Sequence, residues 1–432
     1  MTDRFRADDA LRPLKAFQRK TVDYVAKRLL SDPDAVRHFL VADEVGLGKT
    51  MVARGVIAHT IEALQDKVPR IDIVYICSNG AIAKQNVARL NVMGGERTRV
   101  LPTRLTMLAL ELAKAGGIKH EGFNFFSLTP GTSLDLKQGG GRQEERALIY
   151  RLIRSRFGKQ DQRTIRKMFM RPAGPKGWRA TRKWVNQQDI EISIAGRFKD
   201  ALDREPEVLD HLADLIGQFR LHGDSDKEVR QAIDRCVMML RSILARESAE
   251  ALEPDLIVLD EFQRFTELLH GEGEAADLAR KLFDAVDPDG NQSKVLLLSA
   301  TPYRMLSLRD DEADAGDHYR EFLDVLSFLF GERGPSVRAE LETEMRRYRL
   351  AMQGLPGSFD DACTIKTGIE DTLRSVIART ERVSETSERD AMMRDVDVPV
   401  TVEPADLIEA RAVARVAEAA DAPGTVEYWK SA

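Results

Sequence analysis

A short glycine-rich stretch near the N-terminus has the composition of a phosphate-binding loop. It reads Asp43-Glu44-Val45-Gly46-Leu47-Gly48-Lys49-Thr50 and lies between an apolar run and a helical pattern. Glycines allow backbone N–H groups to curve around a phosphate, and the N-terminus of the following helix adds a favourable dipole. Lys49 could then contact the β- and γ-phosphates of a nucleotide, and the Thr50 hydroxyl could bind Mg²⁺. Asp43 replaces the first glycine of the general motif, and a chance sequence in a solvated turn is the alternative.

An acidic pair at the end of another apolar run could complete this chemistry. The run Leu256–Leu259 is followed by Asp260-Glu261-Phe262-Gln263. A strand that ends in carboxylates would place Asp260 at the C-terminal edge of a sheet, where it could hold Mg²⁺ through water. Glu261 could then orient and deprotonate an attacking water molecule. Taken alone, the acidic pair would be interpreted as a structural cap at the end of a strand. The catalytic interpretation depends on the presence of Lys49 in the same sequence.

Two further signals surround this pair of motifs. Ser299-Ala300-Thr301 closes the apolar run Val295–Leu298, and its hydroxyls could bond to the acidic motif and couple it to a second site. In isolation it would be an ordinary turn at a strand end. Gln18 lies ahead of the phosphate loop and offers a donor and an acceptor that match the N6/N7 edge of adenine. A lone glutamine on a helix would usually be a surface residue.

The four motifs, in this order, resemble those of superfamily 2 helicases and translocases, and specifically their Swi/Snf-like branch. The sequence D-E-V-G-L-G-K-T is similar to the phosphate loop of that branch. This similarity accounts for the aspartate at position 43, where the general motif has glycine. The resemblance implies that Gln18 reads adenine and that Gly46–Thr50 holds the phosphates of ATP with Mg²⁺. It also implies that Asp260–Gln263 is the DExx box, with Gln263, Ser299 and Thr301 in coupling roles. The likeness covers about residues 11–305 apart from an insertion.

The same resemblance implies contacts with nucleic acid, which we expect to be duplex DNA. Ser78 falls where the family contacts the nucleic-acid backbone. So does the segment that contains Thr129, Gly131 and Thr132, although Thr132 stands where the family's T-P-G-R motif has arginine. The sequences of Ser299–Arg304 and Ala378–Arg382 also resemble those of a prokaryotic subgroup of large helicase-like proteins from phage-defence and DNA-modification loci.

A second RecA-like lobe, which this family needs for hydrolysis, is not predicted by the sequence. Thr301 is followed by 131 residues, most of them helical in pattern, and no Gly-Arg-x-x-Arg motif occurs among them. Arg379 and Arg382 have the spacing of arginine fingers but stand where the family has a basic brace. We therefore predict the N-terminal half of a larger helicase, or a split subunit, that binds ATP and hydrolyses it very slowly. A nucleotide-gated binding subunit and a degenerate scaffold are the alternatives.

The elements that would position these residues follow a β-α rhythm. Apolar runs without alternation are typical of buried parallel strands, and helical patterns such as Thr50–Leu64 separate them. The expected strands are His38–Ala42, Ile73–Cys77, Thr98–Leu101, Phe123–Leu128, Leu256–Leu259 and Val295–Leu298. The sequence thus predicts an α/β fold, a single RecA-like P-loop NTPase lobe with a large helical basic insertion and a helical C-terminal extension.

Four domain segments follow from this rhythm. Residues 1–133 and 253–305 should form the lobe, and 134–252 an inserted, mainly helical subdomain. Residues 306–378 should form a helical protrusion, and 379–432 a brace or linker toward a second lobe.

The inserted segment is strongly basic within a chain whose net charge is −5. Residues 151–199 contain 14 lysines and arginines and three acidic residues, and five aromatic residues lie among them: Phe157, Phe169, Trp178, Trp184 and Phe198. These residues could grip a phosphate backbone and stack on bases, or could dock an acidic partner. Alternatively, the aromatic residues form the core of a helical subdomain and the charges its solvated face.

Composition excludes several classes of protein. The charged N-terminus has no signal-peptide run, and no apolar stretch approaches the roughly 20 residues that span a bilayer. Three widely spaced cysteines form neither a disulfide framework nor a metal site. We therefore expect a reduced, cytoplasmic protein.

Overall fold

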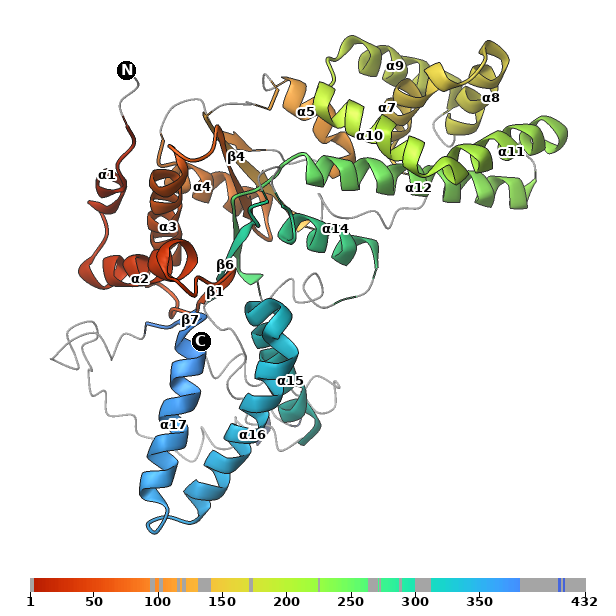
Figure 1. The fold of residues 1–432 in the computed structure, drawn as a ribbon. Coiled ribbons are helices and arrows are strands. Elements are labelled where there is room, and N and C mark those ends of the chain that lie inside the picture. Colours follow the sequence, from red (N-terminus) through yellow and green to blue (C-terminus); the bar gives the residue numbers. More distant parts are fainter. Residues whose placement is uncertain are drawn as a thin grey trace. The chain divides into compact units, whose positions relative to one another are not determined.

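Figure 1 shows the computed structural model of the chain. The chain divides into two compact units, Met1–Glu381 and Arg382–Ala432, and the helices and strands named below belong to the first. The structure describes residues 4–93, 98–100, 104–114, 117–118, 122–130, 141–170, 174–223, 226–262, 271, 273–286, 290–299, 312–380, 411–412 and 415.

A seven-stranded parallel sheet forms the centre of the lobe. Its order is β3-β4-β2-β5-β6-β1-β7. The strands are β1 (His38–Val41), β2 (Arg70–Ile76), β3 (Thr98–Val100), β4 (Gly122–Leu128), β5 (Leu256–Asp260), β6 (Lys294–Leu298) and β7 (Ile377–Ala378). The six expected strands are therefore confirmed, and the fold is a RecA-like α/β lobe with helical additions. The two-residue strand β7 was not expected from the sequence.

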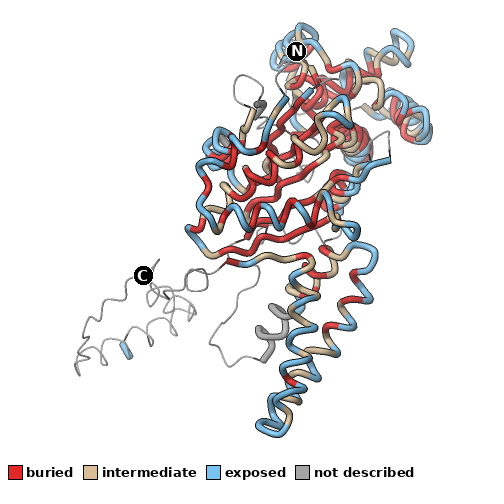
Figure 2. The backbone as a smooth tube through the Cα atoms, turned by 60° about the vertical axis from the view of Figure 1, so that its left-hand side comes forward, coloured by how far each residue is buried: buried red, intermediate tan, exposed pale blue. Residues whose placement is uncertain are grey.

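The strands are apolar on both faces because helices cover both faces of the sheet. In β1, Phe39 and Val41 join one apolar cluster, whereas Leu40 joins the other. The first cluster packs against α1 (Ala7–Leu11), α2 (Ala16–Ala26), α3 (Lys49–Leu64) and α4 (Gly80–Leu90), with the short η1 (Lys27–Ser31) after α2. The second packs against η3 (Leu105–Met107), α5 (Leu108–Lys114) and α14 (Glu274–Phe283). Figure 2 shows the resulting buried strands at the centre of the lobe.

Helices α7 to α12 occupy the sequence between β4 and β5, where the insertion was expected. They are α7 (Gln143–Ile153), α8 (Lys159–Phe169), α9 (Gly174–Gln187), α10 (Ile192–Arg204), α11 (Pro206–His222) and α12 (Lys227–Glu250), with η4 (Arg154–Arg156) after α7. Their apolar residues belong to the same cluster as one face of the sheet. The insertion therefore shares a continuous core with the lobe.

The aromatic residues of the basic segment lie mainly in that core. Phe169, Trp178 and Phe198 are buried, and Phe157 is half-buried. Trp184 is 37% exposed, and the Lys114 ammonium lies 4.9 Å from the centre of its ring. For the aromatic residues, the burial favours the core interpretation over base stacking.

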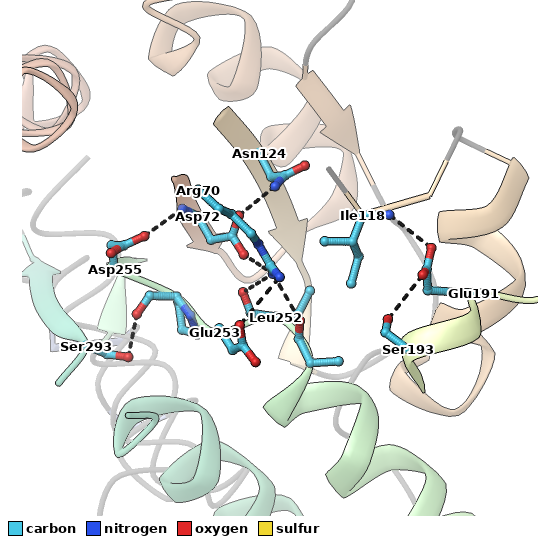
Figure 3. Close-up of polar contacts among 12 residues, drawn as sticks. Arg70, Asp72, Ile118, Asn124, Glu191, Ser193, Leu252, Glu253, Asp255 and Ser293 are labelled. Atoms are coloured by element: carbon cyan, nitrogen blue, oxygen red, sulfur yellow. Dashed lines mark hydrogen bonds and ion pairs between the residues drawn. The ribbon is translucent and has the colours of Figure 1, made fainter. Parts of the chain in front are cut away.

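A polar cluster ties the end of the insertion to the N-terminal ends of the strands (Figure 3). Arg70 pairs with the buried carboxylate of Asp72 and donates to the carbonyl oxygens of Ala251 and Leu252, 3.1 Å away in each case. Asn124 donates to the same carboxylate at 2.7 Å. Burial raises the pKa of Asp72 to about 6, although these donors oppose the rise. The cluster fixes the start of β5 relative to β2 and β4. It thereby also fixes the position of Asp260, at the other end of β5.

The C-terminal helices return the chain to the edge of the sheet. They are α15 (Glu312–Phe330), α16 (Gly334–Gln353) and α17 (Phe359–Arg374), with η6 (Gly331–Arg333) between the first two. His38 of β1 stacks on Phe328 of α15 with ring centres 4.2 Å apart, and its Nδ1 lies 2.6 Å from the Phe328 carbonyl oxygen. After α17, β7 pairs in parallel with β1. Thr380, two residues after β7, lies beside the loop that follows β1, because its carbonyl oxygen accepts from the Glu44 N–H.

Candidate active site

The phosphate loop connects β1 to α3 and depends on two glycines in left-handed conformation. Gly46 has φ +84° and Gly48 has φ +83°. A Cβ atom at Gly48 would lie 2.6 Å from Nε2 of Gln18, so a side chain there would be both strained and crowded. Helix α3 begins at Lys49, directly after this glycine. The expected strand–loop–helix arrangement of Gly46-Leu47-Gly48-Lys49-Thr50 is thus present.

Gln18 contacts the loop from helix α2. Its Nε2 donates to the Leu47 carbonyl oxygen at 2.8 Å, and its Oε1 accepts from the Lys15 backbone N–H at 2.9 Å. The side chain is buried, in contrast to the surface position of an ordinary helical glutamine. Gln18 therefore belongs to the loop's surroundings, and here it holds α2 and the loop together.

Lys49 lies in the electrostatic field of the acidic motif. Its Nζ donates to the carbonyl oxygens of Asp43 at 3.0 Å and of Glu44 at 3.3 Å. Burial lowers the pKa of Lys49, whereas the charges of Asp43, Asp260 and Glu261 act to raise it. The charges of the lysine and of the two carboxylates thus interact, although the loop follows β1, the carboxylates lie at the end of β5, and β6 lies between these strands.

Asp260 is held by two buried polar groups that sequence reasoning did not identify. The Tyr75 hydroxyl donates to Asp260 Oδ2 at 2.6 Å. Asn86 Nδ2 lies 2.9 Å from the Tyr75 oxygen and 3.3 Å from the same Oδ2. Burial raises the pKa of Asp260, and the Tyr75 hydrogen bond opposes this rise. The only signal in the sequence was a tyrosine, a residue with a polar tip, within the apolar strand β2.

Glu261 has an unusual backbone conformation. Its φ is +54°, a value that non-glycine residues seldom adopt and that is enriched at functional sites. Ser78, which follows β2, donates from its Oγ to Glu261 Oε2 at 3.4 Å. A residue expected to contact nucleic acid therefore touches the carboxylate expected to activate water.

The other expected residues are only partly described. The backbone N–H of Ser299 donates to the Val41 carbonyl oxygen at 3.0 Å, which places this buried serine between the loop and the acidic motif. Thr129 is half-buried and directly follows β4. The expected residues Gln263, Thr301, Gly131 and Thr132 lie outside the described residues, as does Arg382.

Asp43 has a structural partner that the motif does not reveal. This buried carboxylate accepts a 2.8 Å hydrogen bond from the backbone N–H of Thr380, just beyond β7. The Glu44 N–H donates back to the Thr380 carbonyl oxygen at 3.2 Å, and the hydroxyls of Thr380 and Thr21 are 3.4 Å apart. Where the general motif has glycine, this loop thus has an acceptor for the returning chain. Arg379, next to Thr380, is exposed.

The donor set is compatible with Mg²⁺. This ion usually takes one or two carboxylates together with substrate phosphates and retains several waters. Asp260, at the carboxyl end of β5, and Thr50, in the first turn of α3, offer oxygen ligands of the appropriate kind. A divalent cation would also favour the charged form of Asp260, whose pKa burial raises.

Comparison with known proteins adds no further support for a family. No family model matches the sequence, and no curated protein matches it. Among the described residues, no helix is both long and apolar enough to cross a membrane. The fold and the residues gathered at the sheet edge define the class of protein, a RecA-like α/β lobe that carries a glycine-rich loop opposite an acidic motif.

Proposed function

We propose that this chain is the ATP-binding motor lobe of a nucleic-acid-dependent ATPase of the DNA helicase or translocase type. The observation that carries the proposal is the shared site of Lys49, Asp260 and Glu261, formed from separate strands at the carboxyl edge of one parallel sheet. Ligand sites in open α/β sheets lie at this edge. The left-handed glycines of the loop, which expose backbone N–H groups to a phosphate, support the same assignment.

The residues have complementary roles in this proposal. Lys49 exchanges its two carbonyl acceptors for phosphate oxygens, which are stronger, charged acceptors. Thr50 and Asp260 hold Mg²⁺, which when bound neutralises charge on the phosphates. Glu261 takes the proton from the attacking water. Gln18, on the loop side of the site, reads adenine after giving up its bond to Leu47.

Nucleic acid, in our proposal duplex DNA, binds along the same edge of the sheet. Ser78 follows β2 and Thr129 follows β4, so both lie where strands end, and Gly131 and Thr132 continue from there in the sequence. The Ser78–Glu261 contact supports coupling between this surface and the hydrolytic carboxylate. Ser299, with Gln263 and Thr301, completes that coupling group.

Hydrolysis depends on an arginine from a second RecA-like lobe, in the same protein or in a partner. The described residues contain one parallel sheet, that of the lobe itself. An arginine finger is worth about 10³–10⁵ in turnover rate, so the chain alone should bind ATP and hydrolyse it very slowly. We place the protein in the cytoplasm, in keeping with its three free cysteines, Cys77, Cys236 and Cys363.

Nucleotide binding and turnover by the full chain test the proposal. We expect Mg²⁺-dependent ATP binding by the wild type and by Lys67→Ala, a matched change at an exposed lysine, and loss of binding in Lys49→Ala. Turnover with duplex DNA should stay near the Lys49→Ala background. ATP affinity no better than that of Lys49→Ala would contradict the proposal. ATP binding that alters DNA affinity, with no hydrolysis even when a second lobe is supplied, would instead identify the nucleotide-gated binding subunit.

Tyr75→Phe is expected to weaken Mg²⁺-dependent ATP binding by about 10-fold, because groups that orient a metal ligand typically contribute 10–100-fold. Asp260 would lose the Tyr75 donor, its pKa would rise further, and the defect should be greater at pH 6 than at pH 8. Titrations with ATP at the two pH values check this. Tyr24→Phe, which removes an exposed hydroxyl that donates to the Arg374 carbonyl oxygen, is the matched control. A loss of equal size at both pH values would exclude the change in Asp260.

A further inference from the structure

Helices α8 and α9 each carry a row of exposed cations, and we call the two rows together the basic face. On α8, Lys159, Arg163 and Arg166 are separated by four and three residues, and on α9 Lys176, Arg179 and Lys183 are separated by three and four. Such spacings place side chains on one side of a helix, about 5–6 Å apart along its axis. The members of the face are Lys159, Arg163, Arg166, Lys167, Lys176, Arg179 and Lys183, all of them exposed.

The basic face has no matching acidic residues. The only acidic residue in α8 or α9 is Asp161, and its carboxylate lies 2.6 Å from the Arg220 guanidinium of α11. Within the described part of the chain, no member of the face forms an ion pair with a described carboxylate. Ordinary solvated helices usually intersperse both signs of charge. The charge is therefore available to an external anion.

Helix α7 joins the two halves of this face. Both α8 and α9 pack against α7 (Figure 1). Arg182 of α9 lies over the ring of Tyr150 of α7, with 5.2 Å between the guanidinium carbon and the ring centre. Burial lowers the pKa of Arg182, and the nearby charges of Arg166 and Arg154 lower it further. The charges of Arg154, directly after α7, and of Arg166 in α8 thus repel that of Arg182 in α9, and a bound phosphate would relieve this repulsion.

The apolar sides of both helices are already used inside the protein. Ile165, Met168 and Phe169 of α8 and Trp178 of α9 are buried. Helices that lie on membranes need an apolar face free to enter the lipid, and protein interfaces usually have an apolar centre. The large apolar residue that remains exposed on α8 and α9 is Trp184. The basic face therefore matches a partner that offers charge alone.

The aromatic side chains of α8 and α9 favour a duplex over a single strand as the nucleic acid bound. Proteins that bind single strands combine a basic groove with several aromatic side chains on which bases stack. Here the Lys114 ammonium already lies over the Trp184 ring, and the other aromatic residues of α8 and α9 are buried. A duplex offers a dense row of phosphates, one charge per about 1.7 Å of helix axis, and needs no stacking surface.

We propose that the basic face of α8 and α9 binds the phosphate backbone of a nucleic-acid duplex. The face belongs to the insertion, apart from the strand ends assigned above, and it would anchor the duplex independently of nucleotide. The inference rests on the proposed function for its choice of nucleic acid as partner. It deepens that function by giving the insertion a role in holding the substrate.

Fluorescence anisotropy with the full chain and a duplex DNA of about 20 base pairs, two helical turns, tests the inference without nucleotide. The triple variant Arg163→Gln, Arg166→Gln and Arg179→Gln removes three members of the face. A control variant, Arg333→Gln, Arg346→Gln and Arg349→Gln, changes the net charge equally at exposed arginines elsewhere. Duplex RNA and single-stranded DNA serve as the other two probes.

The triple variant is expected to bind duplex about 10- to 100-fold more weakly near 0.1 M salt. Its slope of log affinity against log salt should be shallower by roughly 0.9 per lost contact, or nearly 3. Equal losses in both variants, or a preference of the wild type for single strands, would overturn the inference. Duplex RNA that binds as well as DNA supports a backbone site that does not discriminate between them. Because no nucleotide is present, a wild-type ATP affinity no better than that of Lys49→Ala, which would contradict the proposed function, would leave this result unaffected.

Discussion

Replacing Asp43 with glycine, which would complete the general phosphate-loop motif, is expected to destabilise the protein by about 2–3 kcal/mol. The carboxylate is fully buried and accepts the backbone N–H of Thr380 at 2.8 Å. Glycine would leave that N–H without its acceptor and would loosen the loop. Urea unfolding gives the change in free energy, and hydrogen exchange at the Thr380 amide reports the contact itself.

Asp43→Asn is the matched control for this prediction. Asparagine keeps an oxygen at the position of Oδ1 and can still accept the Thr380 N–H, so it should cost about 1 kcal/mol or less. It also removes one of the charges that raise the pKa of Lys49. A glycine variant as stable as the wild type, with Thr380 still protected from exchange, would show that the carboxylate does not hold β7 in place.

The second large effect concerns a buried carboxylate in the insertion, Glu145 of α7. It accepts hydrogen bonds from the hydroxyl of Thr106, from the backbone N–H of Arg142 and from the guanidinium of Arg241, the last at 3.2 Å. Glu145 and Arg241 are both fully buried. Glu145→Ala is expected to destabilise the protein by about 3–5 kcal/mol, because it breaks buried ion pairs with Arg241 and Arg104 and removes the acceptor of two further hydrogen bonds.

Urea unfolding of Glu145→Ala checks this value, and Glu144→Ala provides the comparison. Glu144 is adjacent in α7 but only half-buried, and it forms no ion pair with a described residue. Its substitution should cost less than about 0.5 kcal/mol. A Glu145 variant within about 1 kcal/mol of the wild type, well below the usual cost of breaking a buried ion pair, would show that the polar contacts of Glu145 do not fix the insertion to the lobe. The insertion would then be fixed to the lobe by its apolar core.

Five of the strands could be predicted with ease because β1, β2, β4, β5 and β6 consist mainly of bulky apolar residues, whereas Arg99 interrupts the short β3. A run of bulky apolar residues reflects burial on both faces, a property of the residues themselves. Strand β7 has no such pattern: Ile377 and Ala378 are only half-buried. It exists as a strand because α15, α16 and α17 bring the chain back beside β1, where two residues of pairing suffice. The identity of the two residues does not indicate that they pair with β1.

Burial also settled the two interpretations of the aromatic residues in the basic segment. The sequence shows that Phe169 and Phe198 lie among cations, which is equally compatible with base stacking and with a small core. Only packing places both rings inside the protein. The cations around them stay at the surface, because a charged group cannot be buried at low cost without a partner.

The sequence by itself determined the chemistry of this protein's candidate site. The phosphate loop and the acidic motif can each be recognised within a short segment, because glycine conformations and strand ends depend on neighbouring residues. The tertiary structure alone decided which groups support that site. Tyr75 reaches Asp260 because β2 and β5 are neighbours in the sheet, and Thr380 reaches Asp43 because β7 lies beside β1. Strand order joins residues more than 180 positions apart, and local pattern carries no information about such pairs.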